Sequence, residues 1–147
     1  MKSSGSCVID KSSLVIDASV ALKWVINEAQ SDEALNLLDQ LDSIVCPEIF
    51  FIEIDAVLTK RVRMRELTGA EAKKKKGYIR RLPCQLISTN KIEDEAFELS
   101  TIFNLSYYDA LYLVTSIQYE RVLYTADIRF FNAVQNTLYK DNIQILG

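Results

Sequence analysis

Residues 7–24 read "CVIDKSSLVIDASVALKW" and contain the triplet Val-Ile-Asp twice, ending first at Asp10 and then at Asp17. A short hydrophobic run that stops at an aspartate is typical of a buried strand that delivers a carboxylate to the edge of a sheet. After Asp17 the sequence SVALKWVIN (19–27) predicts a helix, whereas Asp10 is followed by the polar KSS and then by a second apolar run. We therefore predict that Asp17 lies at the sheet edge and that Asp10 belongs to a tail.

Short apolar runs alternate with amphipathic segments along the rest of the chain. The apolar runs predict strands at 14–18, 43–47, 84–88, 121–127 and 143–146. The segments between them predict helices at 19–27, 31–42, 48–67, 93–105, 107–119 and 128–135, and a further helix in the basic segment 68–83 that ends before Pro83. We expect Ser19 and Ser31 to cap the first two helices. The alternation predicts the α/β class, as a three-layer sandwich with a mostly parallel central sheet flanked by helices.

Length and composition limit the number of domains and the kinds of catalytic site. With 147 residues, we expect a flexible N-terminal tail over 1–12 and a single domain over 13–147. The chain has no histidine, which excludes histidine general bases, Ser-His-Asp and Cys-His catalysis, and the usual zinc sites that contain histidine. A net charge of −3 argues against a protein that coats nucleic acid by charge alone. The charge does not exclude an enzyme that acts on nucleic acid through a metal ion.

The cysteines and the N-terminal sequence bear on the compartment. The chain has three widely spaced cysteines, Cys7, Cys46 and Cys84, and an odd number of them predicts no disulfide framework. This pattern is typical of a protein of the reducing cytoplasm. The start MKSSGSCVIDKSS lacks the apolar region of a signal peptide. No apolar run approaches the roughly 20 residues needed to span a bilayer. We expect a soluble, cytoplasmic protein with no membrane partner.

Four carboxylates stand in apolar surroundings. Asp17 and Asp127 each end an apolar strand, whereas Glu53 and Asp109 fall within apolar stretches of predicted helices. The helical neighbours of Glu53, for example, are Ile49, Phe50, Ala56 and Val57. A carboxylate in such surroundings carries a large desolvation penalty unless something compensates for it. A divalent cation bound by oxygen atoms would explain all four acids.

Each acid also has a purely structural explanation. Asp17 and Asp127 could cap the helices that follow them. Glu53 could pair with a basic side chain such as Arg61, and Asp109 could be a favourable charge in the first turn of its helix. Each explanation accounts for one residue at a time. Taken together they are weaker, because a single set of motifs accounts for all four acids at once.

The four acids lie in a set of motifs that resembles a known family. The motifs are LVIDASV (14–20), PEIFFIEIDAVL (47–58), YYDALYLV (107–114) and YTAD (124–127). Their order and spacing resemble the PIN-domain ribonucleases, in particular the small VapC-like toxins of toxin–antitoxin modules. The likeness extends from about residue 13 to residue 146, and its most specific part is YDALYLV followed by YTAD.

The resemblance implies a fold, an activity and a set of site residues. It implies a PIN-like sandwich and an endoribonuclease that uses Mg²⁺ or Mn²⁺ to hydrolyse RNA. Asp17, Glu53, Asp109 and Asp127 match the acidic quartet of the family, as catalytic residues and metal ligands. Ser19 and Thr125 match hydroxyl residues expected to orient the acids or water. It also implies a homodimer and a small antitoxin protein as a partner.

One departure and two other functions stay open. Two residues after Glu53 the family often has an amide, and this chain has Asp55, which either adds negative charge near the site or points away. A non-catalytic PIN-fold module that binds RNA or protein is the main alternative to a nuclease. A phosphotransfer protein is disfavoured, because DAS lacks a D-x-D pair and no lysine directly follows the strand that ends in YTAD.

The basic residues are concentrated in one part of the sequence. They form the runs KRVRMR (60–65), KKKK (73–76) and RR (80–81). Removing the four clustered carboxylates from the net charge of −3 leaves +1 for the rest of the chain. The basic runs either lie along backbone phosphates or form a solvated helix face, and the lysine run alone favours the solvated face.

Overall fold

Residues 12–147 are described by the structure, a computed structural model, and they contain a five-stranded sheet in which every strand pair is parallel. The strands are β1 (Ser13–Ile16), β2 (Ser43–Pro47), β3 (Cys84–Ile87), β4 (Leu123–Thr125) and β5 (Ile143–Ile145). Their order across the sheet is β3-β2-β1-β4-β5. The strand order therefore reverses at β1, with β2 on one side and β4 on the other.

Seven α-helices and two short 3₁₀ turns connect the strands within the described residues. The helices are α1 (Ala18–Leu22), α2 (Ser31–Leu38), α3 (Ile49–Arg63), α4 (Gly69–Ile79), α5 (Glu93–Phe103), α6 (Tyr107–Tyr119) and α7 (Ile128–Gln135). The 3₁₀ turns are η1 (Thr89–Lys91) and η2 (Lys140–Asn142). None of the helices formed by residues 12–147 has both the length and the apolar character that a bilayer-spanning helix requires.

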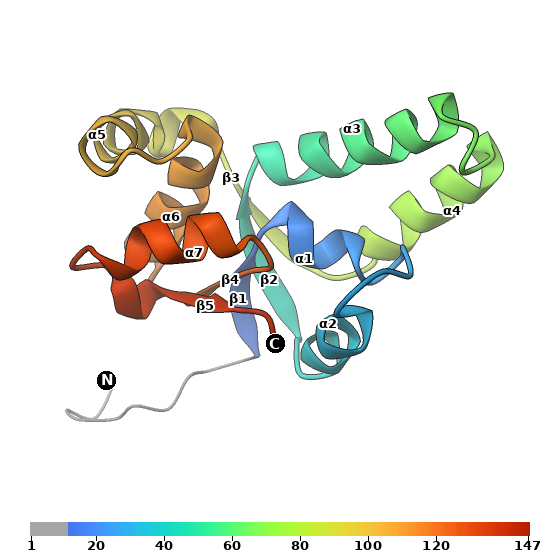
Figure 1. The fold of residues 1–147 in the computed structure, drawn as a ribbon, viewed down its shortest axis with the longest axis horizontal. Helices are drawn as coiled ribbons and strands as arrows, with labels where there is room; N and C mark the ends of the chain where they lie inside the picture. Colours follow the sequence, from blue (N-terminus) through green and yellow to red (C-terminus); the bar gives the residue numbers. More distant parts are fainter. Residues whose placement is uncertain (1–11) are drawn as a thin grey trace.

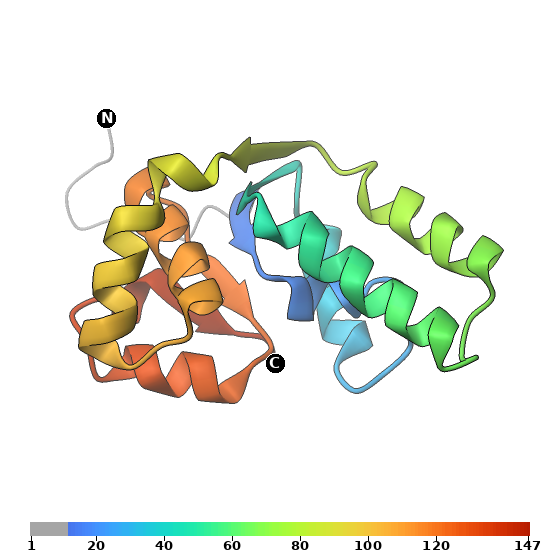
Figure 2. The same cartoon turned by 90° about the horizontal axis from the view of Figure 1, so that it is seen from above.

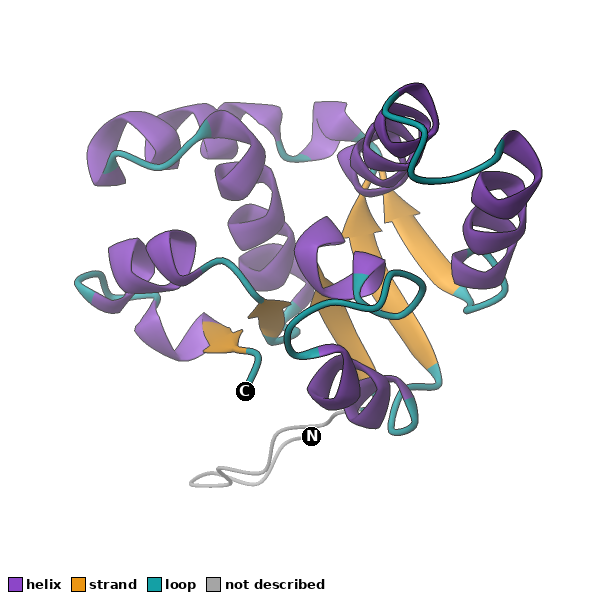
Figure 3. Ribbon diagram, turned by 45° about the vertical axis from the view of Figure 1, so that its right-hand side comes forward, coloured by secondary structure: helices purple, strands orange, loops and turns teal. Residues whose placement is uncertain are grey.

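The helices form two groups around the sheet. Helices α1 to α4 lie together in one half of the molecule, and α5 to α7 lie together in the other half (Figure 2). Helix α6 packs across β1, β2 and β4, while α1 packs against α3 and β4. Helices thus cover a central parallel sheet (Figure 3), which confirms the predicted α/β sandwich.

The core is centred on β1. Leu14, Val15 and Ile16 are completely buried, as expected for a central parallel strand that has helices on its faces. Helix α6 is buried from Ala110 to Ser116, including the hydroxyls of Thr115 and Ser116. Both hydroxyls donate to backbone carbonyl groups, so their burial leaves no unsatisfied donor.

Helices α3 and α4 form an antiparallel arm that extends away from the sheet (Figure 1). A capping box begins α4: the Thr68 hydroxyl accepts from the amide of Glu71, and the Glu71 carboxylate accepts from the amide of Thr68. The Asp55 carboxylate pairs with Lys76 at 2.9 Å and with Arg80 at 3.7 Å. Asp55 therefore points toward α4 and holds the two helices of the arm together.

The structure corrects the predicted beginnings and ends of several elements. Helix α1 begins at Ala18, with Asp17 as its N-cap, and ends at Leu22. A helix is thus present after Asp17, but the predicted cap at Ser19 and the predicted bounds of 19–27 are wrong. The N-cap of α2 is Gln30, which adopts a left-handed conformation, while the Ser31 hydroxyl donates to the carbonyl of Ile26. Residues in a short loop can bond the backbone in several ways, which makes caps hard to predict.

The predicted tail lies almost entirely outside the described residues. Asp10 and the rest of residues 1–11 are among those not described. The carbonyl of Ser12 accepts backbone hydrogen bonds from Asp42 and Ser43, where β2 begins. The prediction that Asp10 belongs to a tail therefore stays a prediction.

Leu123 tests the central position of β4. It is completely buried and lies between Val15 of β1 and Ile143 of β5. We predict that Leu123→Ala lowers the free energy of unfolding by about 2–5 kcal/mol, since truncation leaves a cavity that the neighbouring strands cannot fill. Leu138→Ala is the matched control, because Leu138 is 78% exposed and the same truncation should change stability by less than about 0.5 kcal/mol. Denaturation in urea measures both, and equal effects would contradict the packing described here.

Candidate functional site

The carboxyl ends of β1 and β4 lie next to each other where the strand order reverses. Asp17 directly follows β1, and Asp127 follows β4 by two residues. In open α/β sheets, ligands bind at the carboxyl edge at such a reversal point, because the loops on its two sides diverge and leave a crevice. The topology therefore brings two of the four predicted acids to the edge at which a site is expected.

Asp17 is a buried carboxylate with several hydrogen-bond donors around it. Its side chain is only 6% exposed, and it accepts from the hydroxyls of Ser19 and Thr125 and from the amide of Val20. Burial raises the pKa of Asp17 to about 6, although the three donors oppose this rise. Repulsion from Glu53 raises the pKa further.

Ser19 and Thr125 connect Asp17 to the loop after β4. The Thr125 hydroxyl donates to Asp17 and accepts from the amide of Asp127 at 3.0 Å. The Ser19 hydroxyl donates to Asp17 and accepts from the amide of Ala126 at 3.1 Å. Each hydroxyl thus fixes the position of the Asp17 carboxylate and of the backbone before Asp127.

Glu53 lies in α3 and is half-buried. Its pKa is raised, first by burial and then by repulsion from Asp109. The Tyr112 hydroxyl donates to Glu53 Oε1 at 2.7 Å and opposes this rise. Among the described residues no basic side chain pairs with Glu53; Arg61 pairs with Glu66 instead. The alternative of a Glu53–Arg61 ion pair is therefore wrong.

Tyr112 is a site residue that the sequence analysis missed. Its ring is 2% exposed, and burial together with the Glu53 carboxylate raises the pKa of its phenol well above the usual value. The phenol therefore stays protonated and available as a donor. Its sequence signal is a spacing of three residues after Asp109, which puts both side chains on neighbouring positions of one helix face.

Asp109 lies in the first turn of α6. Its amide donates to the hydroxyl of Ser106, the N-cap of that helix. Burial raises the pKa of Asp109 to about 6, and repulsion from Asp127 and Asp17 adds to the rise. Desolvation is therefore the main reason why the pKa of this first-turn acid is raised.

Asp127 is the most exposed of the four acids. Its side chain caps α7 by accepting from the amides of Arg129 at 2.9 Å and of Phe130 at 3.3 Å. Asp17 caps α1 in the same way. The capping explanation is thus correct for both residues, and it coexists with their position at the sheet edge.

Mutual repulsion connects the four acids. Asp17 is affected by Glu53, Glu53 by Asp109, and Asp109 by both Asp17 and Asp127. Within residues 12–147, however, no group of three or more His, Cys, Asp or Glu side chains is arranged closely enough to hold a metal ion. The four carboxylates share one region of the molecule without forming a closed set of ligands.

The donor chemistry of this region fits a hard divalent cation. All four candidate donors are carboxylate oxygens, which Mg²⁺ and Mn²⁺ prefer. The ion pairs formed among the described residues involve Glu28, Glu66 and Asp55, and none of the four acids. Three of these carboxylates are desolvated, those of Asp17, Glu53 and Asp109. Carboxylates that repel one another and have no basic partner are the kind of set that a cation stabilises.

Comparisons with known proteins agree with the α/β fold described above. The sequence pattern of the PIN domain matches residues 14–135. Among solved structures, PAE2754 from Pyrobaculum aerophilum is similar with a TM-score of 0.64 and 19% identity, over 85% of this chain and 81% of that one. VapBC2 from Rickettsia felis, bound to a DNA fragment from its promoter, is similar with a TM-score of 0.61 and 16% identity, over 92% of this chain and 99% of that one. No curated protein matches this chain in sequence.

The raised pKa of Asp109 leads to a prediction about stability. The folded-state pKa of about 6 lies above the usual 3.8, so the folded protein binds the proton more tightly than the unfolded chain. The stability that is lost by ionising Asp109 in the folded protein is therefore zero well below pH 3.8 and reaches its full size above pH 6. We predict that Asp109→Asn raises the free energy of unfolding by about 1 kcal/mol at pH 7.5 in EDTA, after allowance for solvent screening, and by much less at pH 4.

Asp94→Asn is the matched control for this prediction. Asp94 is likewise an aspartate in the first turn of a helix, but it is exposed. Its substitution should leave stability unchanged or slightly lower it, because only a favourable dipole interaction is lost. Thermal unfolding at the two pH values measures both variants. Destabilisation by Asp109→Asn at pH 7.5 would contradict the desolvation argument.

Proposed function

Because this chain belongs to the PIN domain family, we propose that it is a metal-dependent endoribonuclease, and that it is the toxin of a toxin–antitoxin module. The observation that supports the activity is the set of four carboxylates, which come from four separate parts of the chain and are linked by mutual repulsion. The absence of histidine agrees with it, because metal-assisted hydrolysis of a phosphodiester needs no histidine base.

We propose Asp17, Glu53, Asp109 and Asp127 as the residues that hold Mg²⁺ or Mn²⁺. A bound ion of this kind supplies a more acidic water and stabilises charge that develops on a phosphate. Asp17 is held for this role by Ser19 and Thr125, and Glu53 by Tyr112. Partners that orient ligands in this way commonly change metal affinity or activity by about 10–100-fold when they are removed.

The proposed partners follow from the structural neighbour. VapBC2 from Rickettsia felis is similar over nearly its whole chain, which supports a small antitoxin protein as a partner. We propose further that the protein works in the cytoplasm as a homodimer and that RNA is its substrate. Water as the nucleophile would leave a 5′-phosphate and a 3′-hydroxyl on the products.

A non-catalytic binding module is the second candidate function. The observation that favours it is that the four carboxylates do not form a closed set of metal ligands. Titration with Mn²⁺ by calorimetry separates the two candidates. Binding that is lost in Asp17→Asn supports the nuclease, and the absence of binding at millimolar metal supports the module.

RNA cleavage tests the proposed activity directly. We predict that the wild-type protein cleaves total RNA with Mg²⁺ or Mn²⁺, and that EDTA abolishes cleavage. Asp17→Asn and Glu53→Gln should each lower the rate at least about 100-fold, because each removes a charged oxygen ligand. Asp94→Asn, which removes an exposed charge elsewhere, should cleave like the wild type. Cleavage that survives both EDTA and Asp17→Asn would refute the proposal.

Tyr112→Phe tests the role of the hydrogen bond to Glu53. The substitution keeps the buried ring and removes only the donor, so we predict about 10-fold weaker binding of Mn²⁺ with little change in overall fold. Tyr119→Phe, at the other end of α6, is the matched control and should bind Mn²⁺ like the wild type. Calorimetric titration and circular dichroism measure both properties. Unchanged affinity in Tyr112→Phe would show that this bond does not position Glu53 for metal.

A further inference from the structure

Positive charge is concentrated on the arm formed by α3 and α4. Residues 60–81 contain ten Lys and Arg residues and two Glu residues, a net charge of +8, so the rest of the chain carries −11 within the total of −3. Within residues 60–81, the exposed basic side chains that form no ion pair with any described residue are Lys60, Arg63, Arg65, Lys73, Lys74 and Arg81. A negative body with a positive arm attracts a polyanion to the arm alone.

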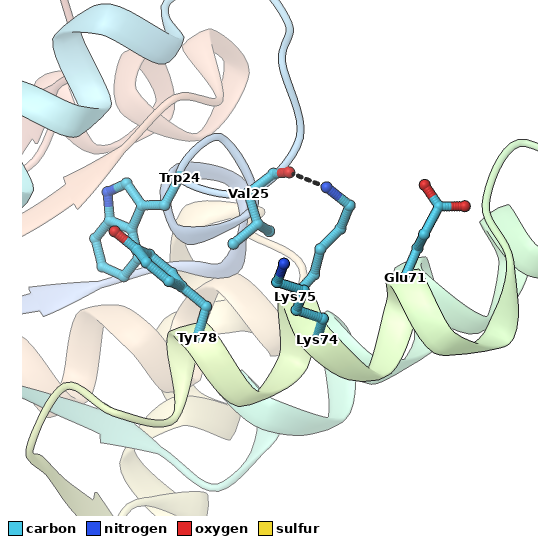
Figure 4. A pocket seen from close by; sticks show the side chains of 6 residues that line it. All are labelled: Trp24, Val25, Glu71, Lys74, Lys75 and Tyr78. Carbon is cyan, nitrogen blue, oxygen red and sulfur yellow. Dashed lines mark hydrogen bonds between the residues drawn. The ribbon is translucent and has the colours of Figure 1, made fainter.

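A cavity of about 380 Å³ lies between α4 and the segment after α1. Trp24 and Val25 line one side of it, and Lys74, Lys75 and Tyr78 of α4 line the other. Figure 4 shows the rings of Trp24 and Tyr78 at one end of the cavity and Glu71 at the other. Its volume falls within the range of small-molecule sites, about 300–1,000 Å³.

The two aromatic rings differ in how they are held. Trp24 is 7% exposed, and its indole nitrogen donates to the carbonyl of Ala34 at 2.9 Å, so its position is fixed. Tyr78 is 44% exposed and presents its ring to solvent beside the lysines. Lys75 donates to the carbonyl of Val25 at 2.6 Å and ties α4 to the segment after α1. The cavity wall is therefore pre-formed, with one ring open to a ligand.

We infer that this surface of α4 binds single-stranded RNA, with phosphates against Lys73 and Lys74 and one unpaired base stacked on Tyr78 at the cavity. The inference rests on the proposed function and identifies where the substrate is held away from the four carboxylates. Every base offers a flat face for stacking, and every nucleotide offers a phosphate, so a lysine-rich helix with one exposed ring suits a single strand.

The composition of α4 favours RNA over a protein partner. A protein that docks on a helix needs several apolar anchors on the exposed face, at helical spacing. Ala72 and Ile79 of α4 are buried in the molecule. Its exposed positions carry two lysines, Lys73 and Lys74, and Tyr78 is the one large apolar side chain among them. An acidic peptide would meet charge on this face and few apolar contacts apart from Tyr78.

Binding can be measured separately from cleavage. The probe is a fluorescein-labelled, unstructured RNA of about 12 nucleotides, and fluorescence anisotropy is recorded in EDTA with all variants in an Asp17→Asn background, so that the RNA stays intact. Lys73→Ala/Lys74→Ala should weaken binding at least 10-fold and reduce the slope of log affinity against log salt by about 1.4. Lys91→Ala/Lys140→Ala removes the same charge elsewhere and should change affinity less than about 2-fold.

Tyr78 tests the stacking contact. Tyr78→Ala should weaken binding about 5–100-fold, whereas Tyr78→Phe should bind like the parent, because stacking needs only the ring. Phe97→Ala is the matched control, since Phe97 is 65% exposed on α5. Equal affinities for Tyr78→Ala and Tyr78→Phe, or equal effects of the two double lysine variants, would overturn the inference.

Two further measurements separate this inference from its alternatives. With Asp17 intact, the arm variants should hydrolyse bis(p-nitrophenyl) phosphate like the wild type, because this small substrate does not reach the arm. RNA binding that depends on the arm in a protein without nuclease activity would support the inference and refute the proposed function. If the wild-type protein cleaves RNA but the Lys73/Lys74 and Tyr78 variants bind RNA as tightly as their parent, the proposed function would be supported and the inference refuted. A polyglutamate peptide that binds as tightly as RNA and loses affinity equally in Tyr78→Ala would overturn the inference in favour of protein docking.

Discussion

The burial of the Asp17 carboxylate is the constraint on which the candidate site depends. A carboxylate that is 6% exposed at the end of the central strand is tolerated only if donors surround it. Ser19 and Val20 supply donors from the first turn of α1, and Thr125 supplies one from the end of β4. The parallel pairing of β1 with β4 is what brings Thr125 to Asp17, so the sheet order and the position of this charge are one arrangement.

These donors offset the desolvation of Asp17 only in part, because its pKa remains raised to about 6. Asp109 has a pKa raised to the same level, and Glu53 is shifted in the same direction. A fold selected for stability alone would replace such residues with neutral ones. The buried apolar strands β1 and β4 and the buried helix α6 provide the stability that lets the chain retain three unfavourable charges next to one another.

The features that the sequence allowed us to predict are those that depend on local pattern. The strand β2 and the helices α6 and α7 begin and end where hydrophobic periodicity and proline or polar residues indicated. Glu53 and Asp109 stood out because their helical neighbours are apolar. The bond from Tyr112 to Glu53 joins residues 59 positions apart, and the pairing of Asp55 with Lys76 joins residues 21 apart. Such contacts depend on how α3 packs against α6 and α4, which no local pattern contains.

The arm and the site carry opposite charge, and their placement on α3 keeps them compatible. Glu53 and Asp55 are two residues apart, which places them on different faces of α3. The face of Asp55 turns toward α4, where Lys76 and Arg80 neutralise it, while Glu53 contacts Tyr112 of α6. If both acids faced α6, the Asp55 carboxylate would add its repulsion to that of the four site acids. If both faced α4, the candidate site would lose the carboxylate of Glu53. An aspartate at position 55 therefore serves the positive arm, and the glutamate two residues earlier serves the negative edge of the sheet.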